Sequence, residues 1–207
     1  MPKHYSTLPQ FNAHLPCAVD LETTGTDPTI HEIIQFGFVP LDMDYTAHKV
    51  LPPFYITVAP DHPELAMAAA TRVHGLDLDD LVKHSPSQSQ ALEMFDEWYE
   101  RLDLAFQRKL IMFAHNASFE QKFLLAWLGQ ERYDSVFAPQ TRDSMTLALA
   151  INDVAIQRGS QVPFERVSLG WLSDHLGINN ARPHDAYADA TAGALVYREL
   201  IKMDVIL

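Results

Sequence analysis

Cysteine is nearly absent from this 207-residue chain, and its one cysteine, Cys17, cannot form an intramolecular disulfide. No spacing of Cys and His residues matches a zinc site, so a zinc ribbon or zinc finger is excluded. Long apolar runs are absent as well. No segment approaches the roughly 18 apolar residues of a membrane span, and residues 1–16 lack the apolar core of a signal peptide. We therefore expect a protein of a reducing compartment, the cytoplasm, with no membrane partner.

Basic side chains are few. The chain has 15 Lys and Arg against 27 Asp and Glu, which gives a formal net charge of −12. A protein that coats nucleic acid by bulk attraction needs Lys and Arg to neutralise phosphates, so this class is excluded. A phosphate-bearing substrate would need a local source of positive charge, such as bound metal ions.

Internal repeats, low-complexity tracts and a linker rich in Pro, Gly or Ser are also absent. The composition, with 47% apolar and 20% charged residues, is that of a globular protein. A chain of this length can bury roughly 70% of the surface that its unfolded form exposes. We expect one domain over residues 1–207, with a core at about residues 17–203.

Hydrophobic periodicity predicts three strands followed by alternating helices and strands. The predicted strands cover residues 18–21, 32–40, 54–58 and 110–114, with a short β segment near residue 136. The predicted helices cover residues 64–72, a stretch after residue 86, and residues 118–128, 169–176 and 185–203, and a loop is expected at 153–163. This order is typical of an α/β fold.

Carboxylates occupy positions where packing predicts apolar side chains. Asp20 and Glu22 are two residues apart in the first predicted strand, so both point to one face while Val19 and Leu21 point to the other. Two buried, ionised acids side by side would be costly, and a bound divalent cation would remove that cost. Taken alone, the pair is also explained if the strand ends at Asp20 and the acids cap a turn.

Two predicted helices repeat this pattern. Glu120 falls at the centre of an apolar helix face, and Asp189 shares a stripe with small and apolar residues of the last helix. Asp185 is the predicted N-cap of that last helix, which places His184 in the turn before it. An imidazole beside an inward acid has the chemistry of a general base near neutral pH. Each feature alone has an ordinary explanation: an acid in a first helical turn favours the helix dipole, and a single histidine is commonly a surface residue.

Taken together, these side chains form a cluster of four carboxylates and one imidazole that converge from a strand and two helices. The cluster comprises Asp20, Glu22, Glu120, His184 and Asp189. Such an oxygen-rich set suits two Mg²⁺ or Mn²⁺ ions and does not suit zinc or haem. Two metals about 4 Å apart can clamp the attacking and leaving oxygens of a phosphoryl transfer.

Five segments of the chain resemble the motifs of the DEDDh, or DnaQ-like, 3'-to-5' exonucleases. In family order they are VDLETTGTDP at 19–28, VHGL at 73–76, FAHNASFEQKFL at 113–124, RDSMTLA at 142–148 and HDAYADA at 184–190. They span most of the chain. The resemblance implies a ribonuclease H-like fold, in which a mixed, mainly parallel five-stranded sheet is flanked by helices.

The resemblance also implies roles for particular residues. Asp20, Glu22 and Asp189 would hold a first metal ion, Asp20 would bridge to a second, and His184 would deprotonate the attacking water. Other matching positions lie near the terminal nucleotide in the family; here they are Thr23, Thr24, Gly25, His74, His115 and Phe119. Asn116 is interpreted as a helix cap rather than a substrate contact.

Glu120 departs from the family pattern, which has aspartate at this position. Glutamate is one methylene longer, so its carboxylate reaches further and adopts more rotamers. We predict a DEEDh variant in which Glu120 ligates the second metal directly, where the family's aspartate commonly acts through water, and alters the preference between Mg²⁺ and Mn²⁺.

The implied activity is that of a metal-dependent exonuclease, which removes nucleoside 5'-monophosphates from the 3' end of single-stranded or frayed DNA. An exoribonuclease on short RNA is the alternative within this class, because no contact to a 2'-hydroxyl can be located in the sequence. A catalytically silent 3'-end-binding or polymerase-accessory module and a phosphomonoesterase or nucleotidase are alternatives from other classes. A homodimer and a separate polymerase partner both stay open.

Overall fold

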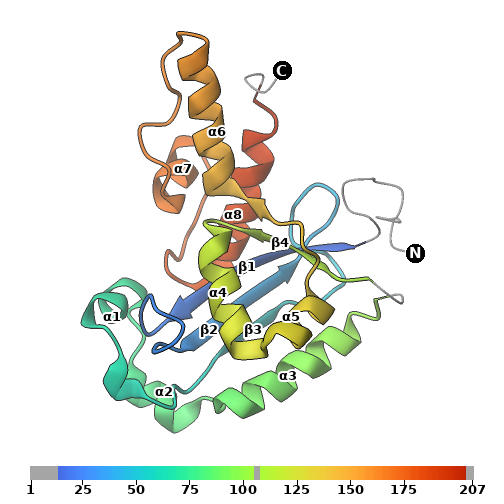
Figure 1. Cartoon of the computed structure of the whole chain (residues 1–207), viewed down its shortest axis with the longest axis vertical. Helices are drawn as coiled ribbons and strands as arrows, with labels where there is room; N and C mark the ends of the chain where they lie inside the picture. Colours follow the sequence, from blue (N-terminus) through green and yellow to red (C-terminus); the bar gives the residue numbers. More distant parts are fainter. Residues whose placement is uncertain (1–13, 105–107, 204–207) are drawn as a thin grey trace.

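The computed structural model describes residues 14–104 and 108–203, which are built around a five-stranded sheet with the strand order β3-β2-β1-β4-β5 (Figure 1). The strands are β1 (Leu15–Thr23), β2 (Ile33–Pro40), β3 (Phe54–Thr57), β4 (Leu110–Ala114) and β5 (Arg142–Asp143). Most of the segment considered as a signal peptide, residues 1–13, lies outside the described residues.

Strand directions make the sheet mixed. β2 pairs antiparallel with both β1 and β3, whereas β4 pairs parallel with both β1 and β5. Four of the five described strands therefore run in one direction and only β2 opposes them. This arrangement confirms the predicted mixed, mainly parallel sheet.

Helices cover both faces of this sheet and continue beyond it (Figure 1). They are the 3₁₀ helix η3 (Pro63–Leu65) and the helices α1 (Ala68–His74), α2 (Leu78–His84), α3 (Gln88–Arg101), α4 (Ala117–Leu128), α5 (Gln130–Val136), α6 (Ser144–Gln157), α7 (Leu169–His175) and α8 (Ala186–Leu200). Within residues 14–104 and 108–203, no helix is long and apolar enough to cross a membrane.

One face of the sheet is packed with aromatic side chains. On β2, the Phe38 ring lies 5.4 Å from Phe95 and 5.7 Å from Trp98, both on α3. The neighbouring Phe36 ring lies 4.5 Å from Trp127 on α4. Burying large rings against each other contributes most of the hydrophobic stabilisation at such a contact. Helices α3 and α4 are therefore fixed on this face.

The opposite face receives the N-terminus of α8 at unusually close range. A Cβ atom on Gly37 would lie 2.2 Å from the carbonyl oxygen of Ala186, so only glycine allows the helix to approach β2 this closely. Beside it, the buried Gln35 side chain accepts a hydrogen bond of 2.8 Å from the Ala186 backbone N–H. This contact sets where the side chains at the start of α8 lie relative to β1.

A second apolar cluster joins α6, α7 and the end of α8, which extend away from the sheet (Figure 1). Its buried members are Ala148, Ile151, Phe164, Leu172, Val196 and Leu200. The Asn152 side chain bonds both backbone groups of Phe164, donating to its oxygen at 2.8 Å and accepting from its nitrogen at 3.1 Å. These bonds hold the loop after α6 against that helix.

Three predictions about local structure were wrong. The segment near Val136 is the helix α5 rather than a strand, and the neighbouring Phe137 forms only an isolated bridge to Leu110. The predicted loop at 153–163 begins later, because α6 runs to Gln157. The helix predicted at 64–72 is divided into η3 and α1 by an extended Met67, whose N–H donates to the Thr24 oxygen at 2.7 Å.

Candidate active site

The C-terminal half of β1 and the start of α8 bring the predicted acids together. On β1, Asp20 pairs with Gly37 and Glu22 with Gln35, so both acids lie beside the two β2 residues over which α8 begins. One potential ligand atom from each of Glu22, His184 and Asp189 lies within 4.8 Å of the others. Asp20 and Glu120 are outside this group of three within the described residues, although their charges act on one another.

The buried Asp189 carboxylate holds the turn that carries His184. One Asp189 oxygen, Oδ2, accepts the His184 backbone N–H at 2.9 Å, and the other accepts the side-chain amide of Asn180. His184 has a φ of 63°, a left-handed conformation that costs energy for a residue with a side chain. The two hydrogen bonds stabilise this strained turn. Sequence reasoning missed Asn180, because nothing in a short polar turn distinguishes one asparagine from its neighbours.

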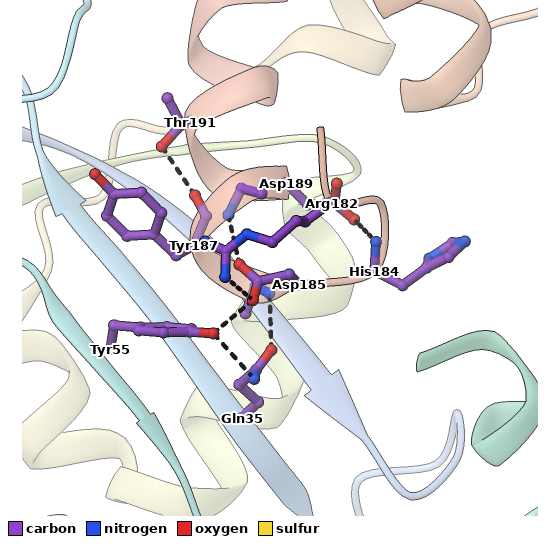
Figure 2. Close-up of polar contacts among 10 residues, drawn as sticks. Gln35, Tyr55, Arg182, His184, Asp185, Tyr187, Asp189 and Thr191 are labelled. Atoms are coloured by element: carbon purple, nitrogen blue, oxygen red, sulfur yellow. Dashed lines mark hydrogen bonds and ion pairs between the residues drawn. The ribbon is translucent and has the colours of Figure 1, made fainter. Parts of the chain in front are cut away.

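A second network anchors the same turn to the sheet (Figure 2). Asp185 caps α8 by accepting the Ala188 N–H at 3.0 Å, which confirms its predicted role. Its other oxygen accepts the Tyr55 hydroxyl at 2.5 Å and pairs with the Arg182 guanidinium at 3.3 Å. Figure 2 shows the His184 ring extending away from these contacts. His184 is exposed to solvent, while its backbone N–H is held by Asp189.

Glu120 lies in the first turn of α4, buried, and its Oε2 atom has no hydrogen-bond partner among the described residues. Burial raises the pKa of this carboxyl well above its usual range, and the neighbouring Asp143 and Glu22 charges raise it further. Burial also raises the pKa of the half-buried Asp20, with further increases from Glu120 and Glu22. These like charges disfavour one another unless a cation or protons intervene.

The same physics acts on Glu22, whose pKa is raised to about 8, first by burial and then by the Asp189 and Asp185 charges. The cluster therefore fits a divalent cation on three grounds. Its donors are carboxylate oxygens, one buried oxygen of Glu120 is unpaired within the part of the chain that the structure describes, and the local charge is strongly negative.

Three of the residues predicted near a terminal nucleotide, Thr23, Thr24 and Gly25, lie at the end of β1 and in the turn after it. Thr23 Oγ1 donates to the Gly25 oxygen at 2.7 Å, and Thr24 Oγ1 accepts the Glu32 N–H at 2.9 Å. A Cβ atom on Gly25 would lie 2.4 Å from the His31 ring. Both threonine hydroxyls therefore shape the turn, which leaves its backbone beside Glu22.

His74, on α1, is a neighbour of His184 across this site. Its Nδ1 atom accepts the Leu76 N–H at 3.0 Å, so a neutral ring carries its proton on Nε2. Burial lowers the His74 pKa and the His184 charge lowers it further, which favours that neutral form. Nε2 is buried and has no partner within residues 14–104 and 108–203. His74 thus offers an unpaired hydrogen-bond donor beside His184.

The remaining predicted residues lie around the start of α4. His115 Nδ1 is 2.9 Å from Ser144 Oγ, and burial lowers the His115 pKa. The ammonium of Lys122 lies 4.9 Å from the centre of the Phe119 ring and donates to the Thr26 oxygen at 2.9 Å. This bond ties α4 to the turn after β1. Asn116 occupies the N-cap position of α4, but its side chain makes no capping bond, so that interpretation was wrong.

A comparison with known families identifies the family of this chain. The exonuclease family model RNase_T matches residues 17–197, a range that contains all five motifs. The chain belongs to this exonuclease family. Its members are DnaQ-like 3'-to-5' exonucleases, so the chain is a metal-dependent exonuclease with a ribonuclease H-like fold. The family typically uses divalent metal ions.

The chain is also similar to two curated proteins and to one solved structure. Ribonuclease T of Baumannia cicadellinicola subsp. Homalodisca coagulata is 23% identical over 93% of this chain and 85% of its own length. A PolC-type DNA polymerase III of Thermotoga maritima is 26% identical over 89% of this chain but only 12% of its own length. The structure of E. coli exonuclease I in complex with a dT13 oligonucleotide has a TM-score of 0.65 at 17% identity, covering 90% of this chain and 40% of that one. The structural likeness shows a shared fold.

Proposed function

We propose that this chain hydrolyses the 3'-terminal phosphodiester bonds of single-stranded or frayed DNA, using two Mg²⁺ or Mn²⁺ ions, and releases nucleoside 5'-monophosphates. The observation that carries the proposal is the meeting of Glu22, His184 and Asp189 within 4.8 Å beside the buried carboxylate of Glu120. We propose that residues 1–207 form a single exonuclease domain.

In this proposal Asp20, Glu22 and Asp189 would hold one metal ion, and Asp20 together with Glu120 would hold a second. When bound, the two ions would supply the positive charge that stabilises the negative charge developing on the phosphate. His184 would accept a proton from the attacking water. Its exposed ring reaches solvent while its backbone is fixed by Asp189, which suits a group that must take up and release protons.

The 3'-terminal nucleotide would lie between the turn after β1 and the start of α4. The Nε2–H of His74, which has no partner within the described residues, would bond an oxygen of the terminal nucleotide. The Thr23–Gly25 backbone would line the sugar, with the Phe119 ring and His115 on the other side. Bases stack on aromatic rings without regard to sequence, which suits an exonuclease that removes any nucleotide.

RNA is the alternative substrate, because the ribonuclease T relative covers 93% of this chain. The complex of exonuclease I with dT13 supports DNA. The match to 12% of a PolC-type polymerase supports a second context, in which the domain acts with a polymerase, either as a monomer or as a homodimer.

The deciding experiment uses 5'-labelled single-stranded DNA and RNA of matched sequence, incubated with the purified protein and Mg²⁺ or Mn²⁺. We expect a ladder that shortens from the 3' end, is absent with EDTA or in Asp20→Asn, and forms faster on DNA. A faster ladder on RNA would make the protein an exoribonuclease. Release of inorganic phosphate would indicate a phosphomonoesterase, and binding without cleavage would indicate a 3'-end-binding module.

The role of the longer side chain at position 120 has its own test. Glu120→Asp should lower the rate and change the ratio of the rates with Mg²⁺ and Mn²⁺, because the shorter carboxylate cannot reach the same position. An unchanged rate and an unchanged metal dependence would remove any special role for glutamate here.

A further inference from the structure

One carboxylate outside the predicted cluster holds the starts of two helices at once. Asp143, the last residue of β5, is the N-cap of α6. Its Oδ1 atom accepts the backbone N–H of Met145 at 2.9 Å and of Thr146 at 3.3 Å, and its Oδ2 atom accepts the Thr146 hydroxyl at 3.0 Å. These three bonds are those of an ordinary helix cap.

The same carboxylate also reaches α4. Oδ1 accepts the Asn116 N–H at 3.0 Å and Oδ2 accepts the Ala117 N–H at 3.2 Å. Asn116 has a φ of 73°, in the left-handed region, and its own side chain does not cap the helix. Asp143 therefore supplies the cap that the sequence assigned to Asn116. The pairing of β4 with β5 explains how Asp143 reaches α4, because Asp143 lies opposite Ala114 at the end of β4, just before that helix.

Glu120 lies about one helical turn after Asn116 and Ala117, the two residues of α4's start that Asp143 bonds. Ala117 and Glu120 are three residues apart on α4, and both are buried, so fixing the first fixes the direction of the second. We propose that Asp143 is a positioning residue for the exonuclease reaction, which sets the start of α4 so that the Glu120 carboxylate reaches the second metal ion. The inference rests on the proposed function, because it takes Glu120 as a metal ligand.

Groups behind a metal ligand tune its geometry, and removing one typically costs about 10- to 100-fold in metal affinity or activity. We therefore expect Asp143→Ala to weaken Mn²⁺ binding, measured by calorimetry on the full chain, by about 10- to 100-fold. The Mn²⁺ concentration that gives half-maximal cleavage should rise in parallel. Asp143→Asn keeps one acceptor oxygen, so its Mn²⁺ affinity should lie between those of the wild type and Asp143→Ala.

A matched control separates positioning from the loss of a helix cap. Asp77 caps α2 by accepting the Asp79 and Asp80 N–H groups, so Asp77→Ala removes an equivalent cap from a helix that carries no proposed ligand. Asp77→Ala should lower the melting temperature while leaving Mn²⁺ affinity unchanged. Equal Mn²⁺ affinities for Asp143→Ala and Asp77→Ala would overturn the proposal.

A double variant tests whether the effect passes through Glu120. In a Glu120→Gln background, Asp143→Ala should cause little further loss of Mn²⁺ affinity, because the ligand it positions is already gone. Additive losses would show that Asp143 acts elsewhere. If Asp143→Ala does not fold, Asp143→Asn in both backgrounds gives the same comparison. These binding measurements hold even if the wild type shows no ladder, so failure of the proposed function would be seen separately.

Discussion

The two faces of the β1–β2 pair are built from the same strands in the same register. On one face, Val19 pairs with Phe38 and Leu21 pairs with Phe36, and their side chains are buried. This face meets the aromatic rings of α3 and α4. Its free energy comes from removing apolar surface from water, so it stabilises the fold with or without a ligand.

On the other face, Asp20 pairs with Gly37 and Glu22 pairs with Gln35, beneath the start of α8. Here burial raises the pKa of both acids, and neighbouring carboxylates raise it further. Without a cation this face opposes folding at neutral pH, because its ionised form is disfavoured. A shift of one residue along these strands therefore separates stabilising positions from functional ones.

The largest expected effect tests the functional face. Asp20→Asn should reduce the exonuclease rate by about 100- to 1,000-fold, the loss typical of removing one preorganised electrostatic group. The melting temperature without metal should stay the same or rise, because one of several like charges is removed. A large fall in that melting temperature would show that Asp20 supports the fold instead.

Phe38→Ala tests the stabilising face. Truncating a buried phenylalanine should lower the free energy of unfolding by about 3–5 kcal/mol, measured by urea denaturation. The rate per folded molecule should change little, because the Phe38 ring contacts α3 rather than the acid cluster. If that rate fell as far as it does in Asp20→Asn, the two faces would not be separable.

Gly37→Ala should lower both the stability of the fold and the exonuclease rate. The added methyl would overlap the Ala186 backbone, so the start of α8 must move away from β2. We expect a loss of about 1–3 kcal/mol in the free energy of unfolding, with a lower exonuclease rate because Asp189 moves with the helix. Gly193→Ala is the control, since its methyl would lie 3.7 Å from His115, an ordinary contact. Equal behaviour of both variants would contradict this account.

The last prediction is a dependence of stability on pH. Glu22 has a folded pKa of about 8, raised from a usual value of 4.5, so the folded state binds the proton more tightly than the unfolded state. Stability is therefore greatest below pH 4.5 for this group and is lost as the pH rises towards 8, by up to about 1.4 kcal/mol per pH unit. The melting temperature of the metal-free wild type should fall between pH 4.5 and 8. In Glu22→Gln, which has no titrating group at this position, the melting temperature should fall less steeply over the same range. Saturating Mg²⁺ should flatten the fall, and a rise with pH would contradict the shift.

Much of the fold was predictable from local patterns. The strand at 110–114 and the helix ending at Leu128 have the predicted bounds or nearly so, because apolar periodicity and helix-forming residues agree there. Alternation also predicted that Asp20 and Glu22 share a face. By contrast, α2 and most of α6 were not predicted. The helix α2 has only seven residues, which is too few to show a clear helical period, and Ala148 and Ile151 of α6 pack in the second apolar cluster rather than against the sheet.

The amino-acid sequence was enough to identify the family and the acids of the candidate site, because residue types at strand and helix positions are visible without the fold. Only the tertiary structure showed Gln35 and Tyr55 fixing the start of α8 and Asp143 fixing the start of α4. These bonds join residues 151, 130 and 27 positions apart. Periodicity reports the environment of a residue relative to its neighbours in the chain. A polar side chain that bonds a distant backbone leaves no such period, because its partner is chosen by how the helices pack on the sheet.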